Sequence, residues 1–244
     1  MKKIILFCCL AALISCQKEG SEYTGDSDSR VLVAIMENDQ MVIGFMYDSL
    51  NRLIRSDNYV NDSVYYSETY QYDAKSRMSR RIYSGFTETY EYDRSGDLIS
   101  VLLVYLAADK EWKTEYQYSR NRISKGITYY DGEKRGYIDF KYDSNGNTIE
   151  RSEYTTTEGQ ADFLDSQFRL TFDEQLCPLK NPYVYPADIT LKNNPVYYYH
   201  YLSVMSSPPI EYHSRYDYDY EGYPIREYRG SRVLTYHYQV DQSF

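Results

Sequence analysis

The side chains that most often perform catalysis or bind metals are few in this sequence and far apart. His200, His213 and His237 show no spacing typical of metal ligands, and Cys177 has no second cysteine near it. No glycine-rich phosphate loop, nucleophile elbow or helical histidine–glutamate pair is present. We therefore expect no catalytic residue, no metal site and no cofactor, and we expect the protein not to be an enzyme.

Two features have both a chemical and a simpler interpretation. Asp217 and Asp219 would lie on one face of a strand, which could form a carboxylate pair. In the simpler interpretation Asp219 caps a turn and Asp217 faces water. Cys177 is likewise expected to be a small buried apolar residue rather than a nucleophile.

Aromatic side chains offer a stronger case for binding, since the chain has 32 tyrosines and one tryptophan. Tyrosine presents a flat apolar body with a polar tip, which suits sugars and rigid protein contacts. Most tyrosines occupy repeated positions where core packing explains them first. The candidates for ligand contact, in predicted variable loops or a proline-rich segment, are Trp112, Tyr59, Tyr183, Tyr185 and Tyr198. Trp112 would be either an exposed platform or a side chain folded onto the rim.

A repeated pattern supplies the elements that position these residues: aromatic-x-aromatic-Asp, a short polar turn, then an apolar residue. In one copy Tyr90-x-Tyr92-Asp93 is followed by Gly96 and Leu98. The aspartate side chain can accept a hydrogen bond from the backbone N–H of the residue two positions later. In a turn that closes into a bulge, the residue three positions after the aspartate needs positive φ, which glycine tolerates. The motif residues are Asp48, Asp73, Asp93, Gly96, Asp143, Gly146, Asp173, Asp219 and Gly222. Each copy therefore predicts a β-hairpin.

Two copies depart from the pattern. Ser119 replaces the aspartate after Tyr118, and Ile123 then comes one residue early. After Asp173, Leu176 stands where glycine is expected. The geometry of these two hairpins is left open.

Alternation along the predicted strands separates an aromatic face from a polar face. Tyr70 and Tyr72 share one face, and the residues between and before them are polar. Because Ile138 and Leu170 occupy the aromatic face in other copies, we expect this face to be the interior. The outward face carries acids, lysines and threonines, which argues against a barrel that spans a membrane, because such a barrel needs an apolar outer band.

The predicted fold class is all-β, an antiparallel meander in a single domain over residues 30–244. A hairpin of residues 31–37 and 40–47 starts it, and residues 215–220 and 233–240 close it. The Asp turns are uniform and indicate scaffold, whereas the variable connections at the opposite end indicate the interaction end. Residues 176–212 hold six of the seven prolines. They are expected to form a Pro/Tyr-rich capping excursion, in which residues 197–201 can still form a strand.

The first residues determine the expected compartment. Lys2 and Lys3 precede an apolar run, residues 4–14, that is too short to span a membrane, which takes about 20 residues, but suits a signal peptide. Leu13-Ile14-Ser15-Cys16 has the form of a lipobox, so residues 1–15 are predicted to be removed and Cys16 to carry lipid. Residues 16–29 would be the lipidated N-terminus and a flexible tether. We expect an outer-membrane lipoprotein, periplasmic or surface-exposed.

The charge balance excludes one class of partner. The formal net charge is −9, and loss of Lys2 and Lys3 makes it more negative by two. Binding of nucleic acid needs clustered lysine and arginine, so we expect no nucleic-acid partner. The membrane, through the lipid on Cys16, and a glycan or an envelope protein remain as expected partners; the oligomeric state is left open.

The turns resemble YD-type (Rhs-like) repeats. With the lipobox, the Tyr-x-Tyr-Asp hairpins and the Asn193-Asn194-Pro195-Val196 run, residues 30–240 are similar to an uncharacterised Gram-negative lipoprotein family, domain of unknown function 4595 with a porin-like fold. The resemblance implies a curved sheet or a soluble porin-like barrel of about 12–16 strands. It implies no activity. The expected function is binding of a glycan, peptide or partner protein through variable loops or an aromatic cavity; the alternative is a structural or accessory envelope scaffold.

Overall fold

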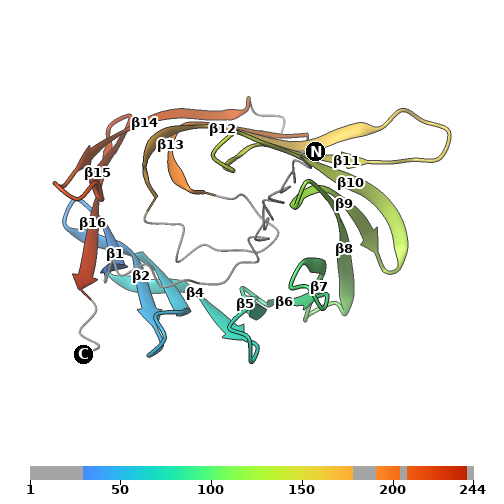
Figure 1. The fold of residues 1–244 in the computed structure, drawn as a ribbon, viewed down its shortest axis with the longest axis horizontal. Coiled ribbons are helices and arrows are strands. Elements are labelled where there is room, and N and C mark those ends of the chain that lie inside the picture. The colour runs from blue at the N-terminus through green and yellow to red at the C-terminus, as the bar shows by residue number, and fades with distance from the viewer. Residues whose placement is uncertain (1–29, 178–190, 204–207, 241–244) are drawn as a thin grey trace, which may run out of the picture.

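In the computed structural model, which describes residues 30–177, 191–203 and 208–240, the chain forms a closed barrel of sixteen antiparallel strands (Figure 1). This confirms the predicted all-β meander and shows that the sheet closes. The strands are β1 (Arg30–Glu37), β2 (Gln40–Tyr47), β3 (Leu53–Val60), β4 (Ser63–Tyr72), β5 (Met78–Tyr83), β6 (Phe86–Tyr92), β7 (Leu98–Tyr105), β8 (Lys110–Ser119), β9 (Arg122–Tyr130), β10 (Glu133–Tyr142), β11 (Thr148–Thr155), β12 (Phe163–Leu176), β13 (Asn193–Leu202), β14 (Ile210–Tyr218), β15 (Pro224–Arg229) and β16 (Arg232–Val240).

The turns at one end of the barrel share one hydrogen-bond scheme. At Asp48, the Oδ1 atom accepts the backbone N–H of Leu50 and of Arg52, both at 2.9 Å, while the Asp48 N–H donates to the carbonyl of Arg52 at 3.0 Å. The residue three positions after the aspartate has positive φ in five such turns: Asn51 (55°), Ser76 (61°), Gly96 (97°), Gly146 (92°) and Gly222 (87°). We call this end the Asp-turn end.

Two hairpins differ from this scheme for reasons visible in their residues. Between β8 and β9, Arg120 and Asn121 have φ of 52° and 63°, which is a two-residue turn that explains the early position of Ile123. At Asp173 the chain makes no tight turn, because β12 continues to Leu176 and pairs with Asn193 of β13. Leucine, unlike glycine, is disfavoured at the positive φ that such a turn requires.

Part of the predicted capping excursion is a barrel strand. The strand allowed at residues 197–201 extends over Asn193–Leu202 and pairs on both sides, with β12 and with β14. Pro195 is accommodated because it lies between two register shifts of the β12–β13 ladder, where a missing N–H costs no regular hydrogen bond. Residues 178–190 lie outside the described part of the chain.

The apolar core is a belt on the inner face, close to the Asp-turn end. It contains apolar residues that follow the turns at this end and aromatic or aliphatic residues of other inward-facing strand positions, all no more than about a tenth exposed: Leu53, Met78, Leu98, Ile123, Tyr70, Tyr90, Ile138, Phe140 and Tyr236. The aromatic face is therefore the interior, as the alternation predicts.

Several irregular positions of the strand ladders, most of them next to Asp turns, accept a hydrogen bond from a tyrosine hydroxyl of a neighbouring repeat. Tyr72 of β4 donates its hydroxyl to the carbonyl of Leu53 at 2.8 Å, and Tyr92 of β6 donates to Met78 at 2.7 Å. Four further hydroxyls donate in the same way: Tyr47 to Leu32, Tyr118 to Leu98, Tyr216 to Pro195 and Tyr238 to Pro224. The accepting carbonyls lie where the ladder is irregular, so these bonds satisfy groups that strand pairing leaves open.

Beyond the belt, the interior is charged, which corrects the expectation that charged side chains stay on the outer face. Glu68, Glu88 and Glu227 share the inward face with the tyrosines that follow or oppose them, and Glu68 and Glu227 are only 7% and 1% exposed. A barrel of sixteen strands is too wide for its own side chains to fill as a dry core, so a polar interior is expected on physical grounds.

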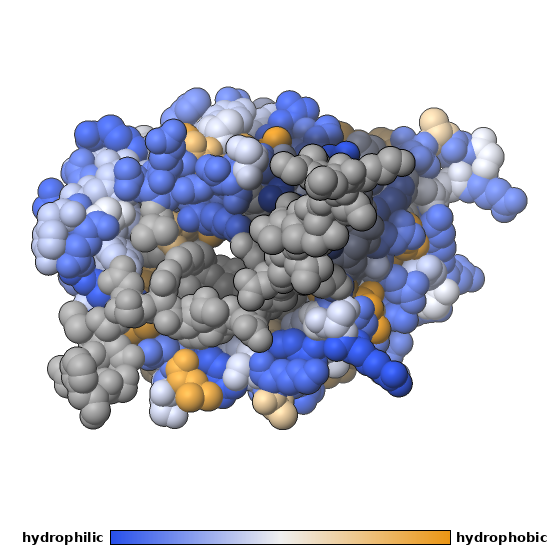
Figure 2. All heavy atoms as spheres, viewed as in Figure 1, coloured by the Kyte–Doolittle hydropathy of each residue, from blue (hydrophilic) through white to orange (hydrophobic). Residues whose placement is uncertain are grey.

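The barrel closes because β1 pairs with β16. The register partners run from Arg30 and Val240 at the Asp-turn end to Glu37 and Leu234 at the opposite end. Ion pairs flank this seam: Arg30 contacts Asp219 at 2.8 Å, and Arg232 contacts Glu37 at 2.7 Å. Hydrophilic residues dominate the end face seen in Figure 2. Among the described residues, no helix is long and apolar enough to cross a membrane.

Candidate ligand-binding site in the barrel lumen

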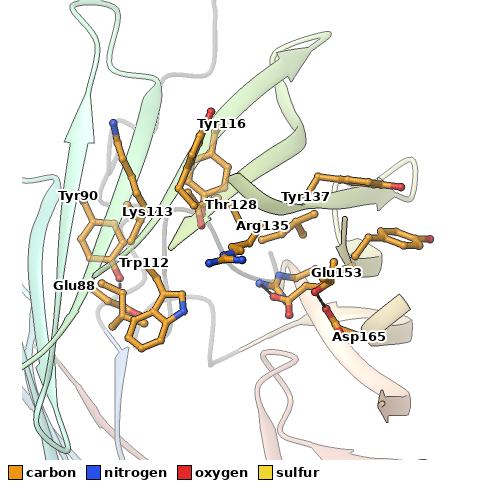
Figure 3. A pocket seen from close by; sticks show the side chains of 18 of the residues that line it. Glu88, Tyr90, Trp112, Lys113, Tyr116, Thr128, Arg135, Tyr137, Glu153 and Asp165 are labelled. Atoms are coloured by element: carbon orange, nitrogen blue, oxygen red, sulfur yellow. Dashed lines mark hydrogen bonds and ion pairs between the residues drawn. The ribbon is translucent and has the colours of Figure 1, made fainter. Parts of the chain in front are cut away.

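A cavity of about 630 Å³ lies against the inner wall formed by β5 to β12 (Figure 3). Its size is within the usual range for small-molecule pockets, about 300–1,000 Å³. Aromatic and charged side chains both line it, among them Tyr90, Trp112, Tyr116, Glu88 and Glu153. The lining thus combines flat apolar surface with hydrogen-bonding groups, as ligand sites generally do.

Trp112 lies in the wall of this cavity, in strand β8 rather than in the loop expected from the sequence. Its register partners are Leu103 of β7 and Tyr130 of β9. The indole ring is 4.9 Å from the ring of Tyr130, at an interplanar angle of 47°. With 39% of Trp112 exposed, the side chain is held from one side and presents apolar surface to the lumen (Figure 3).

A network of charges on β4, β5 and β6 forms one side of the site. Arg81 donates to Glu68 at 3.0 Å and pairs with Glu88 at 3.4 Å. Glu88 also accepts the hydroxyls of Tyr83, at 3.0 Å, and Tyr90, at 2.5 Å. Burial, and then the neighbouring Glu88 carboxylate, raise the pKa of Tyr83, so its hydroxyl stays protonated and donates across the ordinary pH range.

The opposite side comes from β11 and β12. Arg151 pairs with Glu153 at 2.5 Å, and its guanidinium lies 6.0 Å from the rings of both Phe140 and Phe168. Phe168 in turn stacks on His200 of β13 at 3.8 Å and 14°. Burial lowers the pKa of His200 and so favours the neutral imidazole.

Asp165 of β12 lies at the register shift between β11 and β12, and neighbouring residues donate hydrogen bonds to it. It accepts from the Thr155 hydroxyl and, at 3.3 Å, from the Ser203 hydroxyl. The Ser203 N–H donates to its carbonyl at 2.7 Å. Asp165 therefore reaches the cavity as a carboxylate already fixed in position.

Of the three candidate contact residues that the structure describes, only Trp112 lines this cavity. Tyr59 lies in β3 and Tyr198 in β13, where its ring stacks on Tyr212 at 4.7 Å; neither is part of the cavity lining. Tyr183 and Tyr185 lie outside the described residues, as does Cys16.

The residues considered for catalysis have other surroundings. Asp219 caps a turn and pairs with Arg30, while Asp217 accepts the Tyr228 hydroxyl at 2.6 Å. Cys177 is buried, with 1% exposure. Within the described ranges, no three histidine, cysteine, aspartate or glutamate side chains are grouped so that they could hold a metal ion.

The charged residues of the site could have been found from the sequence. Glu68 precedes Tyr70 and Tyr72, and Glu88 precedes Tyr90 and Tyr92, with the same two-residue step. The alternation that places those tyrosines inside places both glutamates inside as well. Arg81 and Arg151 carry no comparable pattern, since the register shifts beside each Asp turn change which face they occupy.

Fold and site together define a sixteen-stranded antiparallel barrel protein with an aromatic and charged lumen cavity. Neither protein-family models nor curated proteins gave a match. Among solved structures, a porin-like protein from Bacteroides uniformis is similar with a TM-score of 0.47 and 12% identity, covering 86% of this chain and 96% of that chain. One from Bacteroides vulgatus gives 0.36 and 10%, covering 85% and 98%. The Photorhabdus luminescens Tc holotoxin pore gives 0.32 and 8%, covering 87% of this chain but 14% of that chain.

Proposed function

We propose that this protein is a cell-envelope lipoprotein whose barrel binds a ligand in the cavity beside Trp112. The observation that carries the proposal is the orientation of Trp112, a large aromatic side chain that is 39% exposed inside a barrel and lines a cavity of about 630 Å³. Covering an exposed tryptophan with a ligand removes a large apolar surface from water and so favours binding, which is why tryptophan is enriched at binding sites.

The chain offers a direct readout, because Trp112 is its only tryptophan. Purified protein would be titrated with three classes of probe, namely neutral oligosaccharides, short peptides and a fatty acid, while tryptophan emission is recorded. At least one class is expected to shift and quench the emission in a saturable way. The variant Thr128→Phe, which places a ring in the cavity wall, should abolish the change.

A matched control removes an aromatic ring elsewhere. Tyr65 is 75% exposed and does not line the cavity, so Tyr65→Ala should titrate like the native protein. If no class produces a saturable change, the proposal is wrong, and the alternative of a structural or accessory envelope scaffold is favoured.

The proposal also includes a lipid anchor at Cys16 and a relationship to a protein family. The Leu13-Ile14-Ser15-Cys16 run supports lipid attachment at Cys16 in the outer membrane, and the Asp-turn geometry supports a relationship to YD-type repeats and to domain of unknown function 4595. Polar outward pairs such as Lys141–Glu150 support a barrel wall that faces water. Metabolic labelling with a clickable fatty acid should mark the native protein and not Cys16→Ser. Equal labelling of both would refute the anchor.

A further inference from the structure

Six of the seven charged side chains that line the cavity form ion pairs, and the seventh, Asp165, accepts hydroxyl groups. Arg81 is shared between Glu68 and Glu88, and Arg151 contacts Glu153. A charged ligand would have to displace one of these partners and leave a partly buried charge uncompensated, which is costly. The wall therefore favours a ligand without net charge.

The sheet around the cavity has no open edge with which a bound peptide could pair. Each described strand pairs with a neighbour on both sides, because β1 closes onto β16. A bound extended peptide usually gains affinity by adding a strand to an open sheet edge. Strand addition is not possible in this closed sheet, so the backbone N–H and C=O groups of a bound peptide would have no strand to pair with.

The groups that do reach the cavity suit a molecule with one apolar face and many hydroxyls. The Trp112 indole provides a flat apolar surface, and Glu88 and Asp165 provide carboxylate oxygens whose positions are fixed by neighbouring donors. The Thr114 and Thr128 hydroxyls, which can both donate and accept, also line the cavity. A pyranose ring has this composition, with C–H groups across one face and hydroxyls around its edge.

We infer that the cavity binds a neutral glycan, with one pyranose ring stacked on Trp112 beside the carboxylate of Glu88, and with further sugar units of the same glycan reaching the carboxylate of Asp165 on the opposite side of the cavity. This inference rests on the proposed function and names the ligand class of the same site. The carboxylates accept sugar O–H groups while they keep their own arginine, tyrosine or hydroxyl donors, since an ionised carboxylate has about four lone-pair sites.

The test compares probes of similar size and different charge. Maltohexaose, xylohexaose and N-acetylchitohexaose are neutral; a galacturonic acid hexamer is acidic; hexa-alanine is a peptide. Isothermal titration of the full-length protein should show binding of at least one neutral glycan, and none of the acidic glycan or the peptide. Raising the salt from about 0.05 M to about 0.5 M should leave the affinity within about twofold, because no charge pair forms on binding.

Variants separate stacking from a general effect on the fold. Trp112→Ala should weaken the neutral glycan at least about tenfold, about 1.4 kcal/mol, whereas Trp112→Tyr, which keeps an aromatic face, should recover most of the affinity. Glu88→Gln should also weaken binding, and Tyr65→Ala should not. Near-ultraviolet circular dichroism of each variant checks that the barrel is retained.

The outcomes distinguish the two levels of the proposal. Binding in the cavity of only the acidic glycan or only the peptide would overturn the neutral-glycan inference and leave the proposed function standing. Unchanged glycan affinity in a folded Trp112→Ala protein would also overturn the inference. Absence of binding by every class would remove the proposed function as well.

Discussion

At the scale of single residues, the inner tyrosines of this chain have two different roles. Tyr70 and Tyr90 fill the core and donate to the inward-facing carboxylates of Glu68 and Glu88, whereas the hydroxyls of Tyr72 and Tyr92 donate to backbone carbonyls of a neighbouring repeat. Tyrosine, and not phenylalanine, suits both positions because its hydroxyl donates to an acceptor, a carboxylate oxygen in the first case and a backbone carbonyl that strand pairing leaves open in the second.

The role of the hydroxyl can be isolated by Tyr72→Phe. The ring keeps its packing and its position 4.7 Å from the Arg52 guanidinium, but the bond to the Leu53 carbonyl is lost. We expect the free energy of unfolding to fall by about 1–2 kcal/mol. Urea denaturation followed by circular dichroism measures the change. Tyr65→Phe, at a position that is 75% exposed, is the control and should differ little from the native protein.

The residue scale is also where prediction from the sequence was least complete. The position of Trp112 in a strand was missed because its neighbours Lys110, Glu111 and Lys113 look like a polar loop. In fact Glu111 and Lys113 alternate with Trp112 along β8, and two of the three charged neighbours form ion pairs: Lys110 with Asp131 and Lys113 with Glu115. Side-chain charge alone does not distinguish an exposed strand face from a loop.

At the scale of elements, the Asp turn is the unit that the sequence specifies best. Its aspartate accepts two backbone N–H groups, and its fourth residue takes positive φ, both of which follow from residue type and offset. The strand register then follows from the turn. The departures at Ser119 and Leu176 are likewise visible in the sequence, but the geometry that replaces the turn is not.

The conformational demand of the fourth turn position can be tested by a matched pair. Gly96 has φ of 97° with open space around its missing Cβ, so Gly96→Ala tests backbone strain alone and should cost about 1–2 kcal/mol of unfolding free energy. Ser76 occupies the same position of the preceding Asp turn with φ of 61°, so Ser76→Gly should be neutral or stabilising by up to about 1 kcal/mol. Thermal and urea unfolding measure both; destabilisation of equal size in the two variants would contradict this account.

At the scale of the whole molecule, the inner tyrosines make the free energy of unfolding depend on pH in the alkaline range. Burial, reinforced by Asp97, raises the pKa of Tyr118 to about 12, and burial raises that of Tyr142 to about 12. Burial also raises the pKa of Tyr236, beside Glu227. In the unfolded chain a tyrosine ionises near pH 10.

The sign follows from proton binding. Between about pH 10 and 12 the folded protein binds more protons than the unfolded chain, so the free energy of unfolding falls as pH rises through this window, and it is undiminished below it. We expect absorbance at about 295 nm to show a late group of tyrosines that ionise together with loss of circular dichroism. Ionisation of all tyrosines near pH 10 with the barrel intact would contradict the prediction.

The overall architecture was predictable from repeats and alternation, but closure and the nature of the lumen were not. Whether a meander curls into a ring depends on strand tilt and stagger summed over all the strands, which no local pattern encodes. The single cavity residue identified beforehand, Trp112, was chosen for its chemistry rather than its position.

The seam between β1 and β16 has a consequence for how the chain reaches this state. Neighbouring strands elsewhere follow one another along the chain, so their pairing can propagate as a succession of short-range steps. At the seam, Arg232 meets Glu37 across 195 positions of sequence. The entropy of bringing such distant segments together is paid before their contacts form, which makes ring closure the natural late and slow event of folding. Until then the two terminal strands are open edges, and that interval is when one copy of the chain is most exposed to pairing with another.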